Sequence, residues 1–240
     1  EIMREAGKIL GTVMRDLSKE VKAGMSTYTL DKIGEEMIRS YGCIPSCKGY
    51  EGYPAAFCIS VNEAIVHSIP SKKIILKEGD IVSLDACLEY KGYQADAART
   101  VGVGQISKEA AQLIEVTKQS FFEGVKYAKE GCHLHEISNA IAAYNESYGY
   151  GVIRELVGHG IGAEMHEDPP IPNFTQQRRG IKLYEGMTLA IEPMVSAGGY
   201  EVEWLDDDWT AVTADRSLAA HYENTVLVTK NGPEILTLVE

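Results

Sequence analysis

The sequence has few basic residues for its length. It contains 23 lysines and arginines against 35 aspartates and glutamates, so its formal net charge at pH 7 is -12. Proteins that bind a nucleic-acid backbone gain affinity when basic side chains displace counterions from phosphates. We therefore do not expect this acidic chain to bind nucleic acid directly.

Long apolar runs are also missing. No stretch approaches the roughly 18 consecutive apolar residues that a membrane-spanning helix needs. The first residues follow an amphipathic helical pattern and contain no signal-peptide core. We expect a protein that is neither inserted in a membrane nor exported, and a cytoplasmic location. Because the first residue is Glu1 and not methionine, we also expect some natural sequence to precede it.

The cysteines lack the paired short spacings of a zinc knuckle or a redox pair. Their number is odd, at five, and they are scattered. Reduced thiols in a cytosolic protein are therefore expected. A chain of 240 residues with 45% hydrophobic content can form a large core without disulfides. The cysteines are Cys43, Cys47, Cys58, Cys87 and Cys132.

An internal repeat organises the chain. The sequence matches itself at an offset of 107 residues, and at this offset Asp85 falls on Glu192. The repeat predicts one domain over residues 1–240, made of two structural repeats at about 1–106 and 107–240. A two-domain arrangement is the alternative, but the paired acids favour halves that close on each other. Other matched pairs are Lys22 with Lys129, Gly24 with Gly131, Ser40 with Ser147, Tyr41 with Tyr148, Gly42 with Gly149, Leu76 with Leu183, Glu78 with Glu185 and Gly79 with Gly186.

Each repeat is predicted to begin with two helices and to continue into strands. Apolar residues that recur every three to four positions predict a long helix from Ile2 and another after Ser107, a suitable N-cap. Shorter helices are expected at about 30–40 and 136–147, each ending at a Tyr-Gly pair. These elements favour an α+β fold, with a curved antiparallel sheet around a shared site and the helices outside. The predicted strands cover residues 80–87, 93–101, 187–195 and 222–228.

Four acids interrupt the apolar strands. Asp85 and Asp96 flank a predicted turn at Lys91-Gly92, where antiparallel pairing can bring their side chains to one face. Glu192 and Glu223 repeat this arrangement in the second half. Two carboxylates about 4 Å apart repel by roughly 4 kcal/mol at an effective dielectric near 20. Arginine or lysine could neutralise them, but Arg99 is the only base beside any of the four in sequence, so two divalent cations are predicted.

Histidine supplies a further ligand type. His159 lies between glycines in Gly-His-Gly-Ile-Gly, which lets the backbone approach closely, and imidazole with carboxylates suits manganese, iron, cobalt or zinc. His67 by its sequence alone favours a structural role. His133, His135 and His221 are likewise interpreted as structural. The segment 152–179, which contains His159 and His166, is predicted to be functional loop and strand.

These residues together resemble a known family. The five ligands in order, the segment Tyr50-Glu51-Gly52-Tyr53-Pro54, the glycine-flanked His159 and the segment Ile191-Glu192-Pro193-Met194 are similar to bacterial type I methionine aminopeptidases, over essentially the whole chain. The short stretch between His166 and Glu192 leaves no room for the helical insertion of type II enzymes. The resemblance implies the pita-bread fold, with internal pseudo-two-fold symmetry, as a single catalytic domain.

The resemblance also implies a mechanism and residue roles. Two divalent ions, Mn, Fe, Co or Zn, would hold a water or hydroxide that attacks the first peptide bond of nascent polypeptides and releases the initiator methionine. The implied ligands are Asp85, Asp96, His159, Glu192 and Glu223. Glu192 would also shuttle a proton, His166 would stabilise the oxyanion and His67 would contact the bond that is cut. The methionine pocket would be formed by Cys47, Tyr50, Tyr53, Cys58, Met165 and Trp209, beside His67 and His166.

Three further expectations follow. The enzyme would work close to the ribosome and as a monomer. A proline-directed aminopeptidase or prolidase of the same fold is the nearest alternative enzyme, and a non-catalytic peptide-binding homologue is the alternative from another class. Met165 stands where an aromatic residue is common in the family, which would change the shape of the pocket.

Overall fold

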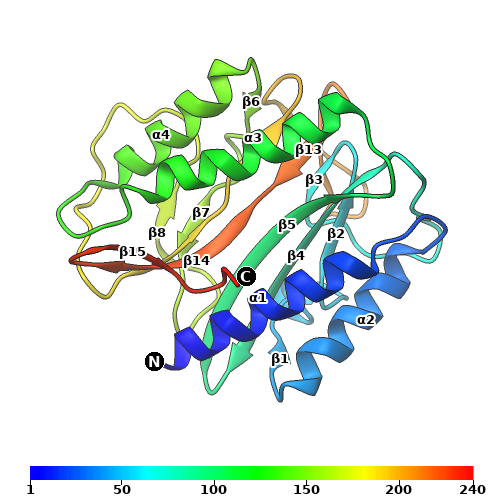
Figure 1. The fold of residues 1–240 in the computed structure, drawn as a ribbon, viewed down its shortest axis with the longest axis horizontal. Helices are drawn as coiled ribbons and strands as arrows, with labels where there is room; N and C mark the ends of the chain where they lie inside the picture. The colour runs from blue at the N-terminus through cyan, green and yellow to red at the C-terminus, as the bar shows by residue number, and fades with distance from the viewer. Residues whose placement is uncertain (240) are drawn as a thin grey trace.

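Two pairs of helices lie on one side of a large β-sheet in the computed structural model, which describes residues 1–239 (Figure 1). The predicted helices are confirmed, although two begin earlier than their apolar periodicity suggests. One starts at Thr27 because the Ser26 hydroxyl accepts a hydrogen bond from the Thr29 N–H, and another starts after His133, which forms a capping box with Glu136. The helices are α1 (Ile2–Glu20), α2 (Thr27–Ser40), α3 (Lys108–Val125) and α4 (Leu134–Ser147).

The main sheet of the described chain has nine strands in the order β1-β4-β5-β14-β9-β7-β8, with β2 paired to β4 and β15 paired to β14. Every pairing between these strands is antiparallel. Strand β5 from the first half therefore lies beside β14 from the second half at the middle of the sheet. The bounds are β1 (Ile44–Pro45), β2 (Cys58–Val61), β4 (Ile81–Tyr90), β5 (Tyr93–Gly102), β7 (Gly158–Gly160), β8 (Glu167–Ile171), β9 (Thr188–Ile191), β14 (Glu223–Thr229) and β15 (Gly232–Ile235).

Two smaller sheets of three strands complete the described fold, in the orders β13-β10-β6 and β11-β12-β3. A single 3-10 turn, η1 (Tyr50–Gly52), precedes β2. The strands are β3 (Ala64–Val66), β6 (Gly151–Val152), β10 (Met194–Ser196), β11 (Val202–Trp204), β12 (Ala211–Thr213) and β13 (Ala219–His221).

The strand predicted over 187–195 is wrong as a single element. Strand β9 ends at Ile191, and β10 begins at Met194 in a different sheet. Pro193 has no N–H to donate to a sheet ladder, so the strand cannot continue through it. The break leaves Glu192 at the end of β9. The predicted turn at Lys91-Gly92 is confirmed, with both residues at positive φ.

The helices cover their own halves of the sheet. Helix α1 packs on β4 and β5, and α3 packs on α4 and on β13. One buried cluster, which includes Leu10, Leu17 and Phe57, draws all its residues from positions before 107, and a second, which includes Phe121 and Val226, draws all its residues from positions after it. Each fully buried side chain of this size stabilises the fold by about 1.5–3 kcal/mol. The α+β pita-bread prediction agrees with this arrangement.

All five cysteines are free thiols in the structure. Within residues 1–239, no helix is both long enough and apolar enough to cross a membrane.

Candidate metal centre

The strand register places the predicted acids on one face of the sheet. In the β4–β5 pair, Asp85 is opposite Ala98 and Cys87 is opposite Asp96. Side chains alternate between faces along a strand, so Asp85 and Asp96 are diagonal neighbours on the same face.

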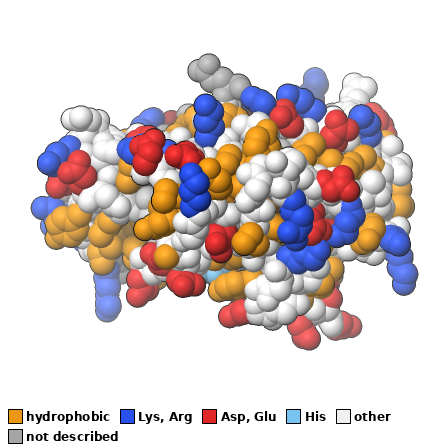
Figure 2. Space-filling model, turned by 90° about the horizontal axis from the view of Figure 1, so that it is seen from below, with side chains coloured by type: hydrophobic (Ala, Val, Ile, Leu, Met, Phe, Trp, Pro, Cys, Tyr) orange, Lys and Arg blue, Asp and Glu red, His pale blue; other side chains and the backbone are white. Residues whose placement is uncertain are grey.

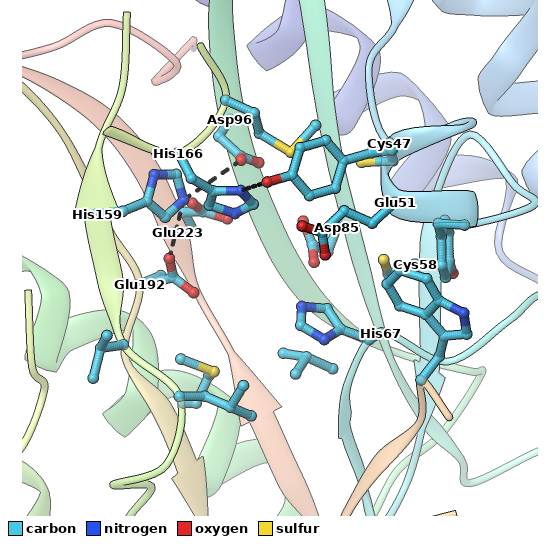
Figure 3. A pocket seen from close by; sticks show the side chains of 18 of the residues that line it. Cys47, Glu51, Cys58, His67, Asp85, Asp96, His159, His166, Glu192 and Glu223 are labelled. Atoms are coloured by element: carbon cyan, nitrogen blue, oxygen red, sulfur yellow. Dashed lines mark hydrogen bonds and ion pairs between the residues drawn. The ribbon is translucent and has the colours of Figure 1, made fainter. Parts of the chain in front are cut away.

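The second half contributes its side chains to this face. Glu223 on β14 is opposite Ala98 on β5, in the row that also contains Asp85. His159 on β7 is opposite Ala190 on β9, and Glu192 lies two residues further along on the same face. Figure 3 shows the resulting cluster, in which the side chains from both halves point toward one another.

The distances in this cluster suit a metal ion. One ligand atom each from Asp96, His159 and Glu223 lies within 4.8 Å of the others. His159 Nε2 is 3.5 Å from Glu192 Oε1 and 3.9 Å from Asp96 Oδ2. Its Nδ1 lies 2.8 Å from the carbonyl oxygen of Gly160, where only a protonated Nδ1 can donate. The lone pair of Nε2 therefore faces the carboxylates, as metal ligation requires.

Burial makes the charged carboxylates costly without a cation. Desolvation raises the pKa values of Asp85, Glu192 and Glu223 well above the usual range, and each is raised further by neighbouring carboxylates. Desolvation also raises the pKa of Asp96, to about 6. Asp96 Oδ1 and Glu223 Oε1 are buried and have no hydrogen-bond partner in the described structure. The oxygen-rich donor set and these unpaired oxygens fit divalent cations.

Arg99 makes no ion pair with the four acids in the described structure, and its charge offsets only part of the raised pKa of Glu223. Its guanidinium donates to the carbonyl oxygens of Ala98 and Glu223, and to the Asn224 side chain at 2.7 Å. Among the described residues that line the cavity at the cluster, none is a lysine or an arginine. The arginine alternative considered from the sequence is therefore not supported by the geometry.

A cavity of about 410 Å³ connects the carboxylate cluster with the predicted methionine pocket. All predicted ligands and pocket residues line it. Sequence reasoning missed several other lining residues. Two of them, Glu51 and Met194, lie inside segments that resemble the family, and three lie in the predicted functional segment 152–179. Val66 stands in no segment that the sequence singled out. The predicted lining residues are Cys47, Tyr50, Tyr53, Cys58, His67, Asp85, Asp96, His159, Met165, His166, Glu192, Trp209 and Glu223, and the missed ones are Glu51, Val66, Glu155, Leu156, Val157 and Met194.

The apolar part of the cavity is held by aromatic packing. The rings of Tyr53 and Trp209 meet edge to face, with centroids 5.0 Å apart. The Tyr53 hydroxyl lies 2.9 Å from the carbonyl oxygen of Ser68 and 3.1 Å from that of Phe57, so the buried phenol is satisfied. Cys58 is buried in the same group of side chains. A preformed apolar wall of this kind suits an unbranched, weakly polar side chain.

Two further histidines face the cavity. His166 Nδ1 lies 2.8 Å from the Tyr50 hydroxyl, and the His166 ring packs at the edge of His159 with centroids 4.3 Å apart. Desolvation lowers the pKa of His67 to about 4, with a smaller contribution from His166. His67 also has a positive φ of 59°, which a residue with a side chain rarely adopts and which is concentrated at functional sites.

The remaining histidines divide into two groups. His133 and His135 lie at the start of α4 and do not line the cavity. His221 was interpreted as structural, yet its buried Nε2 is 3.8 Å from Glu192 Oε2 and 4.0 Å from Glu223 Oε2. The sequence places His221 two residues before Glu223, but its approach to Glu192 depends on the pairing of β13 with β10, which sets His221 opposite Met194.

Comparison with known proteins defines the class. Residues 1–230 match the model of metallopeptidase family M24. The chain belongs to this family and is a metallopeptidase, an enzyme whose family implies a divalent metal ion.

Within the family, the similarity is to methionine aminopeptidases, which confirms the resemblance noted in the sequence. The methionine aminopeptidase of Clostridium acetobutylicum is 57% identical over 240 residues, which cover 100% of this chain and 96% of that protein. The crystal structure of methionine aminopeptidase from Thermotoga maritima superimposes with a TM-score of 0.97 at 44% identity, covering 100% of this chain and 96% of that one.

The same fold occurs in a proline-directed relative. Prolidase from Pyrococcus furiosus matches with a TM-score of 0.78 at 25% identity, covering 100% of this chain and 64% of that chain. The architecture alone therefore does not select between the two activities.

Proposed function

We propose that this protein removes the N-terminal initiator methionine from newly made proteins by hydrolysing their first peptide bond. The observation that carries the proposal is that one cavity joins the carboxylate–histidine cluster to an apolar pocket. Whole-chain similarity to methionine aminopeptidases supports the same activity.

Two divalent ions are proposed for the cluster. Asp85, Asp96, His159, Glu192 and Glu223 would hold them, and two dications match the four carboxylate charges. Mn, Fe, Co and Zn all accept oxygen and imidazole ligands. When bound, such ions would polarise the substrate carbonyl and, by lowering the pKa of water, would supply the attacking water or hydroxide at neutral pH.

The side chains around the ions have distinct proposed roles. Glu192 would take the proton from the attacking water and deliver it to the leaving amine. The Tyr50 hydroxyl would donate to His166 Nδ1, which leaves Nε2 protonated and able to donate to the oxyanion of the substrate. His67 would contact the peptide bond from the opposite side of the cavity (Figure 3).

Specificity would come from the fit of the methionine side chain. Cys47, Tyr50, Tyr53, Cys58, Met165 and Trp209 supply sulfur atoms and aromatic rings around the space it would fill. Such a pocket discriminates by about 1–3 kcal/mol per methylene. The flexible Met165 widens the range of shapes that the wall can adopt.

A peptide series tests this proposal against the prolidase alternative. The metal-free protein is reconstituted with Mn²⁺, Co²⁺ or Fe²⁺ and assayed on Met-Gly-Met and on Xaa-Pro peptides. We expect release of methionine from the first and little cleavage of the second. Preference for Xaa-Pro peptides would replace the proposed substrate. A protein that binds peptides but cleaves neither series with any of the three metals would be a non-catalytic homologue.

The substrates and setting of the reaction are also proposals. The partners would be the N-termini of nascent polypeptides near the ribosome, in the cytoplasm, and the enzyme would act as a monomer. On the face shown in Figure 2, basic side chains are interspersed with acidic ones, which supports the expectation that nucleic acid is not bound directly.

We further propose that residues 1–240 form one catalytic domain of two repeats, 1–106 and 107–240. The succession α1-α2-β4-β5 followed by α3-α4-β9-β14 supports it, as do the two separate buried clusters. One cooperative unfolding transition, coincident in far-UV and near-UV circular dichroism, is the expected result for the full chain.

A further inference from the structure

His221 has an unusual environment for a residue that only fills space. Its exposed fraction is 1%, and neither ring nitrogen has a hydrogen-bond partner in the described structure. Leaving one buried donor or acceptor unpaired costs about 1–3 kcal/mol. A leucine of similar size would avoid that cost, so the imidazole calls for a functional explanation.

The ring is directed at the metal-site carboxylates. Nε2 is 3.8 Å from Glu192 Oε2 and 4.0 Å from Glu223 Oε2. What a neutral imidazole can offer here is one N–H donor.

Glu192 lies between two imidazoles. Its Oε1 faces His159 Nε2 at 3.5 Å, and its Oε2 faces His221 Nε2. When one oxygen of a carboxylate ligates a metal, the other commonly accepts a hydrogen bond that fixes the orientation of the group. The distance of 3.8 Å is about 1 Å longer than an N–H···O bond, so a small movement of the carboxylate would form it.

The backbone of His221 is fixed by the strands that carry the first-half acids. Thr100 Oγ1 accepts from the His221 N–H at 2.8 Å and lies 2.9 Å from the His221 carbonyl oxygen. The same hydroxyl is 2.7 Å from Ser83 Oγ. Thr100 is on β5 with Asp96, and Ser83 is on β4 with Asp85, so these bonds set the position of His221 relative to both acids.

We propose that His221 is a positioning residue of the metal centre, whose Nε2–H holds the Glu192 carboxylate in the orientation that binds metal. This role rests on the metal site of the proposed function. The proposed role of His221 differs from that of the five ligands, because His221 would act through Glu192 and would not itself be a ligand.

The test compares metal affinity with the stability of the metal-free protein. His221→Leu removes the donor and keeps the bulk, His221→Gln keeps a side-chain N–H, and His135→Leu is the control for a histidine outside the cavity. Mn²⁺ binding to the metal-free proteins is measured by titration calorimetry. We expect His221→Leu to bind Mn²⁺ 10- to 100-fold more weakly, the scale of losing such a partner of a ligand. His221→Gln should recover most of the affinity, and His135→Leu should bind like the wild type.

Thermal unfolding without metal provides a second measurement, in which His221→Leu is not expected to lose stability although it loses Mn²⁺ affinity. His221→Leu should be at least as stable as the wild type, because two unpaired buried nitrogens are removed. A purely structural role of His221 predicts the reverse: His221→Leu would have lower stability and unchanged Mn²⁺ affinity. That result would overturn the proposal. If His221→Leu does not fold, His221→Asn, whose amide is too short to reach Glu192, replaces it in the comparison with His221→Gln.

Two other outcomes are distinguishable. A different visible absorption spectrum for Co²⁺-loaded His221→Gln would identify His221 as a direct ligand and overturn the positioning role. Wild-type protein that binds no divalent ion would overturn the proposed function and, with it, this role. Normal Mn²⁺ binding by His221→Leu would remove the role of His221 alone.

Discussion

At the scale of single residues, the position of the proton on each histidine determines what the ring can do. The Gly160 carbonyl requires a proton on His159 Nδ1 and leaves Nε2 as a ligand atom. At His166, the neighbour of Nδ1 is the Tyr50 hydroxyl, which can donate and so leave Nε2 as a donor. With these protons, the two neighbouring imidazoles, whose ring centroids are 4.3 Å apart, would serve the opposite tasks proposed for them.

Replacing His166 with alanine tests its task. Because His166 is not among the proposed ligands, metal content should be unchanged, whereas kcat should fall by about 10²-fold or more, the scale of losing one oxyanion donor. Metal analysis and steady-state assays on a methionyl peptide measure the two effects. His135→Ala is the control and should behave like the wild type. An unchanged kcat for His166→Ala would assign the oxyanion to another donor.

Replacing Tyr50 with phenylalanine tests how His166 is oriented. The change removes the 2.8 Å hydrogen bond and keeps the ring. A net contribution of about 0.5–1.5 kcal/mol predicts a two- to tenfold loss of kcat, smaller than that of His166→Ala. The same change in the His166→Ala background should have no further effect on kcat. A full additional loss there would show that Tyr50 acts independently of His166.

At the scale of elements, close approach of backbones positions the strands that carry the acids. A Cβ on Gly11 of α1 would lie 2.4 Å from the Thr237 carbonyl oxygen, and one on Gly7 would lie 2.5 Å from that of Leu236. The segment after β15 therefore packs directly on the α1 backbone. Because Thr237 also bonds Asn224 and Thr225 on β14, this contact ties α1 to the strand of Glu223.

Gly11→Ala tests this contact. In an ordinary helix the change would stabilise by about 0.5–1 kcal/mol. Here the clash involves backbone atoms, so we expect a lower free energy of unfolding, by about 1–3 kcal/mol. Thr12→Ala, one residue further along α1 and only partly buried, is the control and should have little effect. Urea unfolding of both variants measures the difference, and stabilisation by Gly11→Ala would contradict the close packing.

At the scale of the whole molecule, the two halves meet where their acids meet. Strands β5 and β14 pair at the middle of the sheet. Glu223 and Asp85 lie on opposite sides of Ala98, in the same row across three strands. The pairing of β5 with β14 brings the four carboxylates of the two halves together at a buried cavity. The free energy of unfolding is therefore expected to depend on both pH and metal.

The metal-free protein should lose stability as pH rises. Asp96 has a pKa of about 6 in the folded chain, above its unfolded value of about 4, so the folded state binds more protons between these values. Its stabilising contribution is complete below about pH 4 and is lost as pH rises through about 6. Asp85, Glu192 and Glu223 are shifted in the same direction and extend the loss to higher pH.

Urea unfolding in EDTA, at several values between pH 4 and 8, measures this dependence. Saturating Mn²⁺ at neutral pH should restore stability, by about 2.7 kcal/mol at a hundredfold excess over Kd. Replacing Asp96 with asparagine should flatten the pH dependence without metal. Stability that rises steadily with pH in EDTA would indicate that these carboxylates are not held together in the metal-free fold.

The sequence by itself determined the helices, four strands of the main sheet, the five candidate ligands and the family, because these depend on local periodicity, on strand-flanking acids and on motifs. Only the tertiary structure decided the direction of Arg99 away from the acids and the place of His221 beside Glu192. These features depend on which face of the sheet a side chain occupies and on which strand becomes its neighbour. Long-range strand pairings, such as that of β10 with β13, set both, and no local pattern encodes them.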